Sequence, residues 1–187
     1  MERSARGTFP RGIPQLGPPG FAGVRSVKWL AEVTVQDQPS AAHPQARDYK
    51  LFPPGVTKET ANWRVGRTIN EMPLNSVICE PAASACLPAG GVTFRGYAVS
   101  GEQPVVRVEM SLDGGDHWAE AELEDDLASG GSWTFWRYSA DLRRGGYELV
   151  VRAWDAAGRT QPASLEHVWN FRGYLNSAWH RVAISVV

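Results

Sequence analysis

Cysteine and net charge are both scarce in this sequence. The 187 residues include two cysteines, Cys79 and Cys86, and the formal net charge is −1. Two cysteines are too few for a disulfide framework or for a thiolate metal site, which usually takes three or four ligands. They could pair with each other, but we expect buried free thiols. A net charge near zero gives no general attraction to nucleic acid or to an anionic membrane, so we expect neither partner.

Long apolar runs and common catalytic motifs are also absent. No apolar run approaches the ~20 residues that span a bilayer. The sequence has no glycine loop that opens a helix, no serine nucleophile elbow and no CxxC pair. The four histidines are scattered, so no metal cluster is predicted. What the chain does have is 43% hydrophobic residues and eight tryptophans, enough for a substantial globular core.

The first third of the chain has little regular pattern. Residues 1–18 are rich in glycine, proline and arginine without the apolar run of a secretory signal, and we expect a disordered or aberrant N-terminus. Alternating apolar residues from Val27 to Val35 favour a strand. Residues 36–74 hold no period and are interrupted by prolines, which predicts a long connecting segment. The aromatic residues expected to pin this segment are Tyr49, Phe52 and Trp63.

Short strands at regular spacing follow from residue 75. Each segment has a β-branched or aromatic run bounded by turn residues, and Asp113-Gly114-Gly115-Asp116 is the clearest hairpin turn. This rhythm predicts an all-β fold, an immunoglobulin-like antiparallel β-sandwich with an irregular N-terminal extension. The predicted strands lie in NSVICEPA, GGVTFRGYAVSG, VVRVEMSLDGGDHWAEAEL, SWTFWRYSADL, GYELVVRAWDAAG and HVWNFRG.

Several conspicuous side chains have ordinary structural interpretations. His180 lies near the final strand and is expected to be a packed or hydrogen-bonded residue rather than a general base. The acidic run in a glycine-rich turn predicts solvated loop charge rather than a catalytic acid/base pair; it comprises Glu124, Asp125 and Asp126. Tryptophans on predicted strands are expected to lie mostly in the core; they are Trp118, Trp133, Trp136 and Trp154.

Seven longer motifs follow one another along the chain: RSVKWL, ARDYKLFPP, INEMPLNSVICEP, VTFRGYAVSG, VRVEMSLDGGDHW, VVRAWDAAGRTQP and VWNFRGYLNSAWHRV. In this order they resemble the C-terminal part of the sulfite oxidase family of molybdenum enzymes, from about Pro19 to the C-terminus. By this resemblance, residues 19–35 are a remnant of the molybdopterin-binding domain. Residues 36–74 are the connecting segment, and residues 75–187 are the immunoglobulin-like domain that forms a homodimer.

The resemblance also implies which parts are lacking. The family's molybdenum-ligating cysteine belongs to a large domain that precedes RSVKWL, and neither Cys79 nor Cys86 corresponds to it. We therefore expect a fragment or an N-terminally truncated gene product, with no catalytic residue and no metal ligand of its own. The intact enzyme would hold molybdenum-molybdopterin, which this chain alone would not bind stably.

Two segments are expected to carry function by position in the family. Ser26, Val27 and Lys28 match a segment that closes the pterin pocket, and Lys28 with Arg25 forms a reasonable anion clamp. The ordinary alternative for them is a solvated strand edge. Arg172 matches an arginine that reaches into the substrate pocket, where a guanidinium binds two oxygens and stays protonated. Its ordinary alternative is an arginine that ends a strand and pairs with a surface carboxylate.

The resemblance implies oxidation of sulfite with water to sulfate, with two electrons passing to an acceptor. Three alternatives stay open. The chain could be a stand-alone, non-catalytic dimerisation module, or the tail of a nitrate reductase-type enzyme. An unrelated immunoglobulin-like adhesion or carbohydrate-binding module is disfavoured by the motif series. Neither the compartment nor the electron acceptor is indicated by the sequence.

Overall fold

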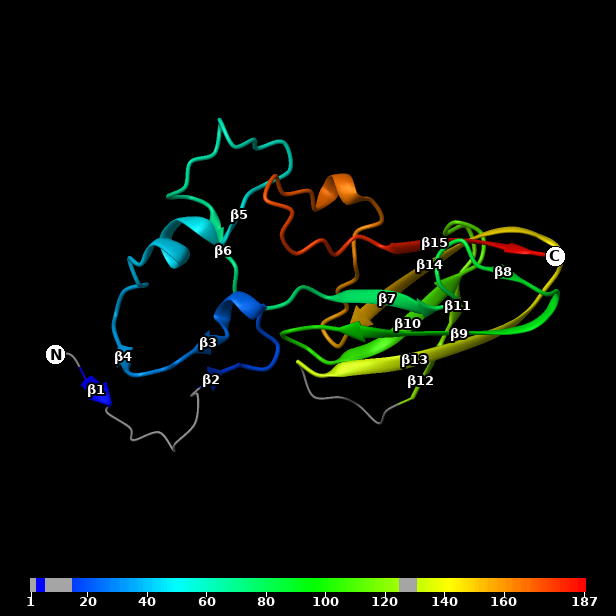
Figure 1. Cartoon of the computed structure of the whole chain (residues 1–187), viewed down its shortest axis with the longest axis horizontal. Coiled ribbons are helices and arrows are strands. Elements are labelled where there is room, and N and C mark those ends of the chain that lie inside the picture. Colours follow the sequence, from blue (N-terminus) through cyan, green and yellow to red (C-terminus); the bar gives the residue numbers. More distant parts are fainter. Residues whose placement is uncertain (1–2, 6–14, 125–130) are drawn as a thin grey trace.

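The computed structural model describes residues 3–5, 15–124 and 131–187. A two-sheet β-sandwich begins at residue 75 and occupies the right half of Figure 1. The preceding residues form an irregular extension at the left, held together by short strand pairs. Regular structure in the described residues is nearly all β, so the predicted immunoglobulin-like sandwich with an N-terminal extension is confirmed.

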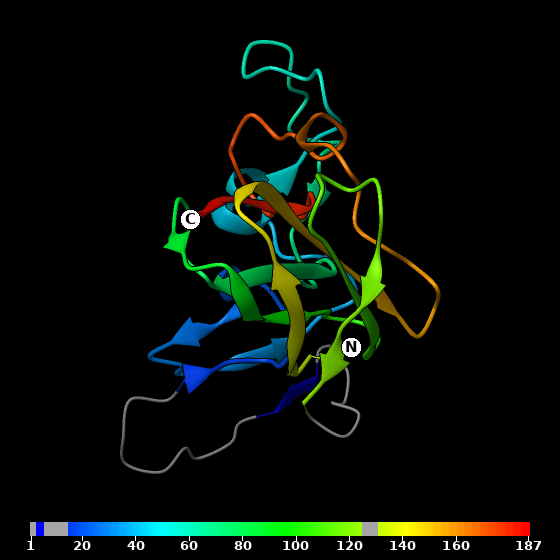
Figure 2. The ribbon, with the colours of Figure 1, turned by 90° about the vertical axis from the view of Figure 1, so that its right-hand side faces the viewer.

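The sandwich consists of a four-stranded and a five-stranded sheet (Figure 2). All pairings in them are antiparallel except β15 with β8. The four-stranded sheet has the order β12 (Glu122–Leu123), β13 (Trp133–Leu142), β9 (Gly90–Val99) and β7 (Asn75–Glu80). The five-stranded sheet has the order β11 (Ala119–Glu120), β10 (Val105–Ser111), β14 (Gly145–Asp155), β15 (His180–Val186) and β8 (Cys86–Leu87).

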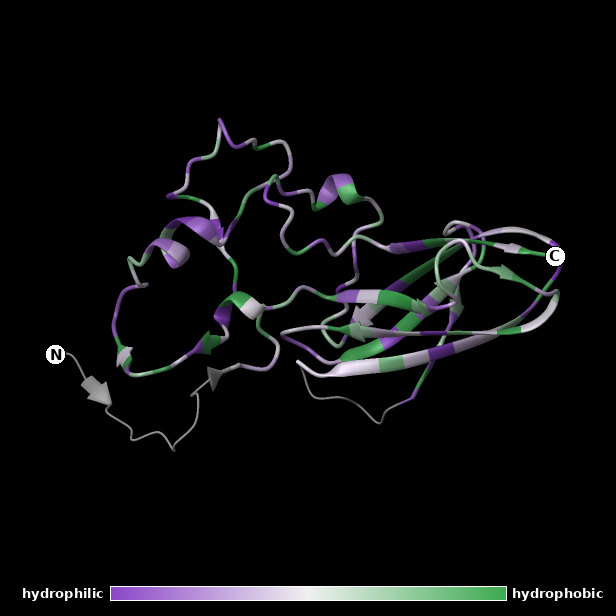
Figure 3. Cartoon of the chain, viewed as in Figure 1, coloured by the Kyte–Doolittle hydropathy of each residue, from purple (hydrophilic) through white to green (hydrophobic). Residues whose placement is uncertain are grey.

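The core lies between these sheets because their strands alternate in polarity. Successive residues of a strand point to opposite faces, so one set of alternate residues is buried. In β15 the pattern buries Val182, Ile184 and Val186, and Figure 3 shows the same alternation of green and pale or purple residues along other strands. The largest fully buried side chains are Trp136, Phe94, Met110 and Leu149.

The predicted hairpin turn after β10 is confirmed. Gly114 and Gly115 have φ angles of +78° and +106°, which glycine adopts without the steric penalty of a side chain. Asp113 stabilises the turn by accepting hydrogen bonds from the Ser111 hydroxyl at 2.7 Å and from the His117 amide at 2.9 Å. These contacts hold the pKa of the Asp113 carboxyl well below its usual range, with the His117 amide as the largest cause.

Burial predictions for two residue types were partly wrong. Trp136 is 0% exposed and Trp133 is 54% exposed, because residues three apart on one strand face opposite sides of the sheet. Trp118 and Trp154 are half-buried. Cys79 and Cys86 are free, as predicted, but both are exposed rather than buried. Cys79 follows the buried Ile78 in β7 and so takes the solvent face.

The extension contains short elements in place of the single strand predicted from Val27 to Val35. That prediction was wrong, since Trp29 has a φ angle of +53° and separates two strands. The strand pairs are β1 (Arg3–Ala5) with β4 (Val33–Val35), β2 (Gln15–Leu16) with β3 (Val27–Lys28), and β5 (Lys50–Leu51) with β6 (Arg67–Thr68). The helical turns are η1 (Gly23–Arg25) and η2 (Pro44–Asp48).

The strand predicted in HVWNFRG is absent from the structure. Residues 156–179 form instead a long excursion between the neighbouring strands β14 and β15, with one helical turn, η3 (Leu165–His167). The Ser164 hydroxyl caps this turn by accepting from the Glu166 amide at 3.2 Å. Gly173 has a φ angle of +70°, which ends any extended run there. Of the acidic turn, Glu124 is exposed, and Asp125 and Asp126 lie outside the described residues.

His180 has the structural role predicted for it. It begins β15, is half-buried, and its Nδ1 accepts a hydrogen bond from the Ile78 amide at 3.2 Å. Since Ile78 belongs to β7, this contact joins the two sheets of the sandwich. The imidazole therefore acts as a neutral acceptor within the fold.

We expect His180 to make stability fall on acidification. Burial lowers the pKa of His180 below its ordinary value of 6.5, so between that value and the lower folded-state pKa the unfolded chain binds more protons than the folded protein. Its contribution is constant above about pH 6.5. Below that pH, the free energy of unfolding decreases until the pH reaches the folded-state pKa. The total decrease is about 1.4 kcal/mol for each unit by which the fold lowers the pKa of His180. Urea denaturation across this range should show a flatter pH dependence for His180→Gln, whereas the exposed-residue control His167→Gln should match wild type. Equal slopes for wild type and His180→Gln would contradict the expectation.

Candidate functional site

Arg172 lies on the 156–179 excursion, which docks against the segment around β5 and β6. Figures 1 and 2 both place the orange excursion beside the cyan residues that connect these two strands. Aromatic rings form the contact: Phe171 lies 5.4 Å from Phe52 and 5.9 Å from Trp63 between ring centroids, and Phe52 lies 5.3 Å from Trp63. The prediction that Phe52 and Trp63 pin the connecting segment is therefore confirmed.

The Arg172 side chain is exposed and rests on aromatic groups. Its Cζ lies 5.9 Å from the centroid of the Trp63 ring and 5.5 Å from that of Tyr174. Its Nη2 donates to the Tyr174 hydroxyl at 3.1 Å. A guanidinium held over aromatic faces gains cation–π stabilisation and keeps its other donors available. Tyr174 in turn lies 6.0 Å from Tyr49, the third aromatic residue predicted to pin the segment.

Arg47 is a second basic residue beside Trp63, and the sequence pattern did not predict it. Its Cζ lies 5.5 Å from the centroid of the Trp63 ring, so one indole contacts two guanidinium groups. Among the described residues, no ion pair includes Arg47 or Arg172. The pairing of Arg172 with a surface carboxylate is therefore not what the described structure contains. Two unpaired guanidinium groups over one ring can attract an anion.

A cavity of about 420 Å³ lies between the β5–β6 segment and the excursion. It is mainly apolar, with two basic residues, and Tyr174 contributes to both its wall and the Arg172 contact. Its lining includes Phe52, Val65, Arg67, His167, Val168 and Tyr174. The arrangement combines apolar walls with nearby cationic donors, which suits a small anion or the acidic end of a larger ligand.

The predicted cofactor segment, Arg25 with Ser26–Lys28, lies at η1 and β3. Arg25 Nε donates to the Ile69 carbonyl at 2.6 Å, and its Nη1 donates to the Gln45 side chain. The Nη2 of Arg25 is buried without a hydrogen-bond partner. Lys28 and Val27 are exposed, and no ion pair in the described chain includes Lys28. Two cationic groups are therefore left without an anion in this segment.

The structure does not bring the predicted cofactor segment, residues 25–28, into contact with Arg172. Within the described ranges, no hydrogen bond, ion pair or ring contact joins residues 25–28 to Arg172. The same ranges contain no group of three or more His, Cys, Asp or Glu side chains placed to hold a metal ion. They also contain no helix long and apolar enough to cross a membrane. The described chain therefore has two separate cationic sites, one with Arg25 and Lys28 and the other with Arg47 and Arg172.

Comparisons with known proteins agree with one another. The relatives include sulfite oxidases of Mus musculus, 41% identical over 175 residues, and of Gallus gallus, 41% identical over 168 residues. These alignments cover 90% and 87% of this chain, but 32% and 37% of the relatives. The NADH nitrate reductase 1 of Phaseolus vulgaris is 38% identical over 187 residues, covering 90% of this chain and 21% of that protein. The chain thus spans about a third of the length of the sulfite oxidases.

The fold and the family model lead to the same assignment. The crystal structure of the sulfane dehydrogenase SoxCD from Paracoccus pantotrophus matches with a TM-score of 0.77 at 24% identity, covering 90% of this chain and 43% of that chain, which supports the fold. A family model described as the Mo-co oxidoreductase dimerisation domain matches residues 66–187. The chain therefore belongs to the Mo-co oxidoreductase dimerisation domain family, and its similarity to sulfite oxidases extends over nine tenths of its length.

Proposed function

We propose that this chain provides the dimer-forming sandwich and one substrate-binding arginine of a sulfite oxidase-type molybdenum oxidoreductase. The observation that carries the proposal is Arg172, an exposed guanidinium without a carboxylate partner in the described chain, braced on Trp63 and Tyr174. Sulfite is a small oxyanion, and a planar guanidinium can donate to two of its oxygens at once. Arg172 would thus hold and orient the substrate, and it is not assigned a proton-transfer role.

The residues near η1 fit the anionic parts of a molybdopterin cofactor. The buried Nη2 of Arg25 lacks an acceptor, and the exposed Lys28 ammonium has no ion-pair partner among the described residues. A phosphate or pterin oxygen would supply acceptors for both, with Ser26 and Val27 forming the adjoining backbone. The bound cofactor would supply the two-electron redox chemistry. This chain's residues would anchor its charged end.

A nitrate reductase-type substrate is the second candidate, and it rests on the 38% identity to the plant enzyme. Nitrate carries one negative charge whereas sulfite and sulfate carry more, so a pair of guanidinium groups at Trp63 favours the dianion.

The third candidate is a dimerisation module without redox activity. Molybdenum analysis with sulfite-dependent reduction of an acceptor separates it from the enzyme, because the module would show neither metal nor turnover.

We expect Arg172→Gln to weaken sulfate binding by the full chain about 10- to 100-fold, which corresponds to one charged hydrogen-bonding group of ~1.5–3 kcal/mol. Sulfate serves as a stable stand-in for sulfite in calorimetric titration at low ionic strength, where screening is small. Arg144→Gln is the matched control, since Arg144 is exposed beside the β13–β14 turn and has no contact with Trp63.

The outcomes of this titration separate the candidates. Unchanged affinity in Arg172→Gln would rule out the substrate role, and equal losses in both variants would reduce it to a general charge effect. Nitrate binding more tightly than sulfate would favour the nitrate reductase-type substrate. Sedimentation of the same samples tests the homodimer, which a monomer at all protein concentrations would contradict.

A further inference from the structure

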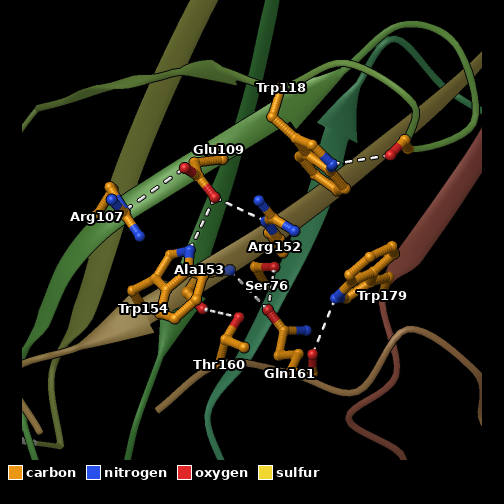
Figure 4. Close-up of polar contacts among 11 residues, drawn as sticks. Ser76, Arg107, Glu109, Trp118, Arg152, Ala153, Trp154, Thr160, Gln161 and Trp179 are labelled. Carbon is orange, nitrogen blue, oxygen red and sulfur yellow. Dashed lines mark hydrogen bonds and ion pairs between the residues drawn. The ribbon is translucent and has the colours of Figure 1, made fainter. Parts of the chain in front are cut away.

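The 156–179 excursion is closed at its base by a buried amide. Gln161 is 3% exposed, and its Oε1 accepts from the Ser76 hydroxyl at 2.6 Å and from the Ala153 amide at 3.0 Å. Its Nε2 donates to the Ser177 carbonyl at 3.3 Å. Figure 4 shows that the Trp179 indole donates to the Gln161 carbonyl, at 2.9 Å. Both ends of the excursion are therefore tied to each other and to both sheets.

The base is continuous with a packed cluster on the outer face of the five-stranded sheet. Figure 4 shows Arg152 beside Trp118 and Trp179, with its Cζ 3.9 Å and 5.5 Å from the two ring centroids. Arg152 Nε also donates to Glu109 at 2.7 Å. Burial alone would raise the pKa of Glu109, but the hydrogen bonds from the Trp154 indole and from Arg152 lower it. Trp179 is thus held by Gln161 on one side and by Arg152 on the other, so the base of the excursion is rigid.

Asn170 fixes the part of the excursion next to Arg172, away from the base. The residue is 4% exposed, and its Oδ1 accepts from the Arg172 amide at 2.9 Å. Its carbonyl accepts from the Gly173 amide at 2.7 Å, which closes a tight turn around Arg172. Its Nδ2 donates to the Phe52 carbonyl at 3.5 Å, across 118 positions of sequence. One buried amide therefore shapes the turn and docks it onto the β5–β6 segment.

The turn determines where the guanidinium is presented. Phe171 points into the aromatic contact with Phe52 and Trp63, so the next residue, Arg172, leaves the turn toward solvent. A long exposed arginine loses side-chain conformational entropy when it binds an anion. The fixed backbone and the hydrogen bond to Tyr174 already restrict the Arg172 side chain, so less entropy is lost on binding. The buried amide of Asn170 thus bears on anion affinity through the turn that carries Arg172.

We propose that Asn170 is a positioning residue, which preorganises Arg172 for anion binding through the turn that its side chain closes. This inference rests on the proposed function of Arg172. Asn170→Ala removes both side-chain hydrogen bonds and is expected to weaken sulfate binding about threefold to tenfold. Asn170→Ser keeps a weaker acceptor for the Arg172 amide and should recover part of the affinity.

A double-mutant cycle tests the mechanism. Sulfate titrations of the full chain compare wild type, Asn170→Ala, Arg172→Gln and the double variant. If Asn170 acts through Arg172, Asn170→Ala weakens binding in the wild-type background and has no effect in the Arg172→Gln background. Asn176→Ala is the matched control, because Asn176 makes the same contact, from the Ala178 amide to its Oδ1 at 3.1 Å, away from Arg172. It should leave the affinity unchanged.

Three results would overturn the inference. Full affinity in Asn170→Ala, with Arg172→Gln still impaired, would remove the positioning role and leave the proposed function intact. Equal losses from Asn170→Ala in both backgrounds would show a general structural effect. An Arg172→Gln variant with wild-type affinity would remove the proposed function itself, and with it the basis of the inference. Circular dichroism of each variant confirms that the sandwich is folded, and Asn170→Ser provides the milder change if Asn170→Ala unfolds.

Discussion

Gly96→Ala is expected to prevent the sandwich from folding stably. Gly96 lies in β9 between its neighbours β7 and β13, directly opposite Ile78 and Trp136. A Cβ added there would lie closer than 3.0 Å to the Val77 carbonyl oxygen and to the Trp136 indole. Real Cβ atoms almost never approach so closely. Because one obstacle is backbone, we expect a loss beyond the usual ~1–3 kcal/mol of overpacking, a large fraction of the ~5–15 kcal/mol that stabilises a typical domain.

Gly146→Ala is the matched control for this change. Gly146 also lies in a sandwich strand, β14, and a Cβ added there meets nothing within 4 Å. We expect Gly146→Ala to be nearly neutral, or to stabilise slightly by restricting the unfolded chain. Thermal unfolding and soluble yield measure the difference. A Gly96→Ala variant with the melting temperature of Gly146→Ala would show that β7 and β9 can separate at no cost, against the structure.

The sandwich could be predicted from the sequence because its determinants are local. Alternating burial in β13 and β15 is written in the order of their residues, and the glycines after β10 specify their turn. The strand predicted in HVWNFRG was wrong for a non-local reason. Asn170 uses its side chain for the hydrogen bonds of a turn and reaches Phe52, far away in sequence. No periodicity reveals such a contact.

The candidate site could be predicted only in part. Arg172 came from resemblance to a family, and the structure adds the aromatic surface that holds it. Arg47 was missed because its contact is with Trp63, whose position depends on the packing of the connecting segment against the excursion. The signal available in the sequence was a basic residue within an aromatic-rich loop, which by itself does not distinguish a binding group from solvated charge.

The sandwich and the candidate site are mechanically linked through one side chain. Gln161 hydrogen-bonds Ser76 in the four-stranded sheet and the Ala153 amide in the five-stranded sheet, and it also closes the base of the excursion. The relative position of the two sheets therefore bears on the segment that carries Arg172. A dimer-forming domain built this way can present a substrate-binding arginine from a rigid base, since the base includes its own core strands.

Trp136→Ala is expected to lower the free energy of unfolding by about 3–5 kcal/mol, the range for removing a large aromatic side chain from a core. Trp136 is 0% exposed and pairs with Gly96 of β9, and its ring occupies the space that a side chain at position 96 would need. The glycine offers no side chain to fill the cavity on that side, and Leu123 of β12 is the opposed residue on the other side. Trp133→Ala is the control from the same strand: its ring is 54% exposed and should contribute about 1 kcal/mol or less.

Trp136→Phe separates packing from hydrogen bonding at this position. The Trp136 indole nitrogen is buried without a partner in the described chain, and phenylalanine would remove that unsatisfied donor while keeping most of the ring volume. We therefore expect a smaller loss than for alanine, measured by urea denaturation with the same m-value. Equal losses for Trp136→Ala and Trp133→Ala would show that the two faces of β13 are not distinguished by burial, and the core assignment would fail.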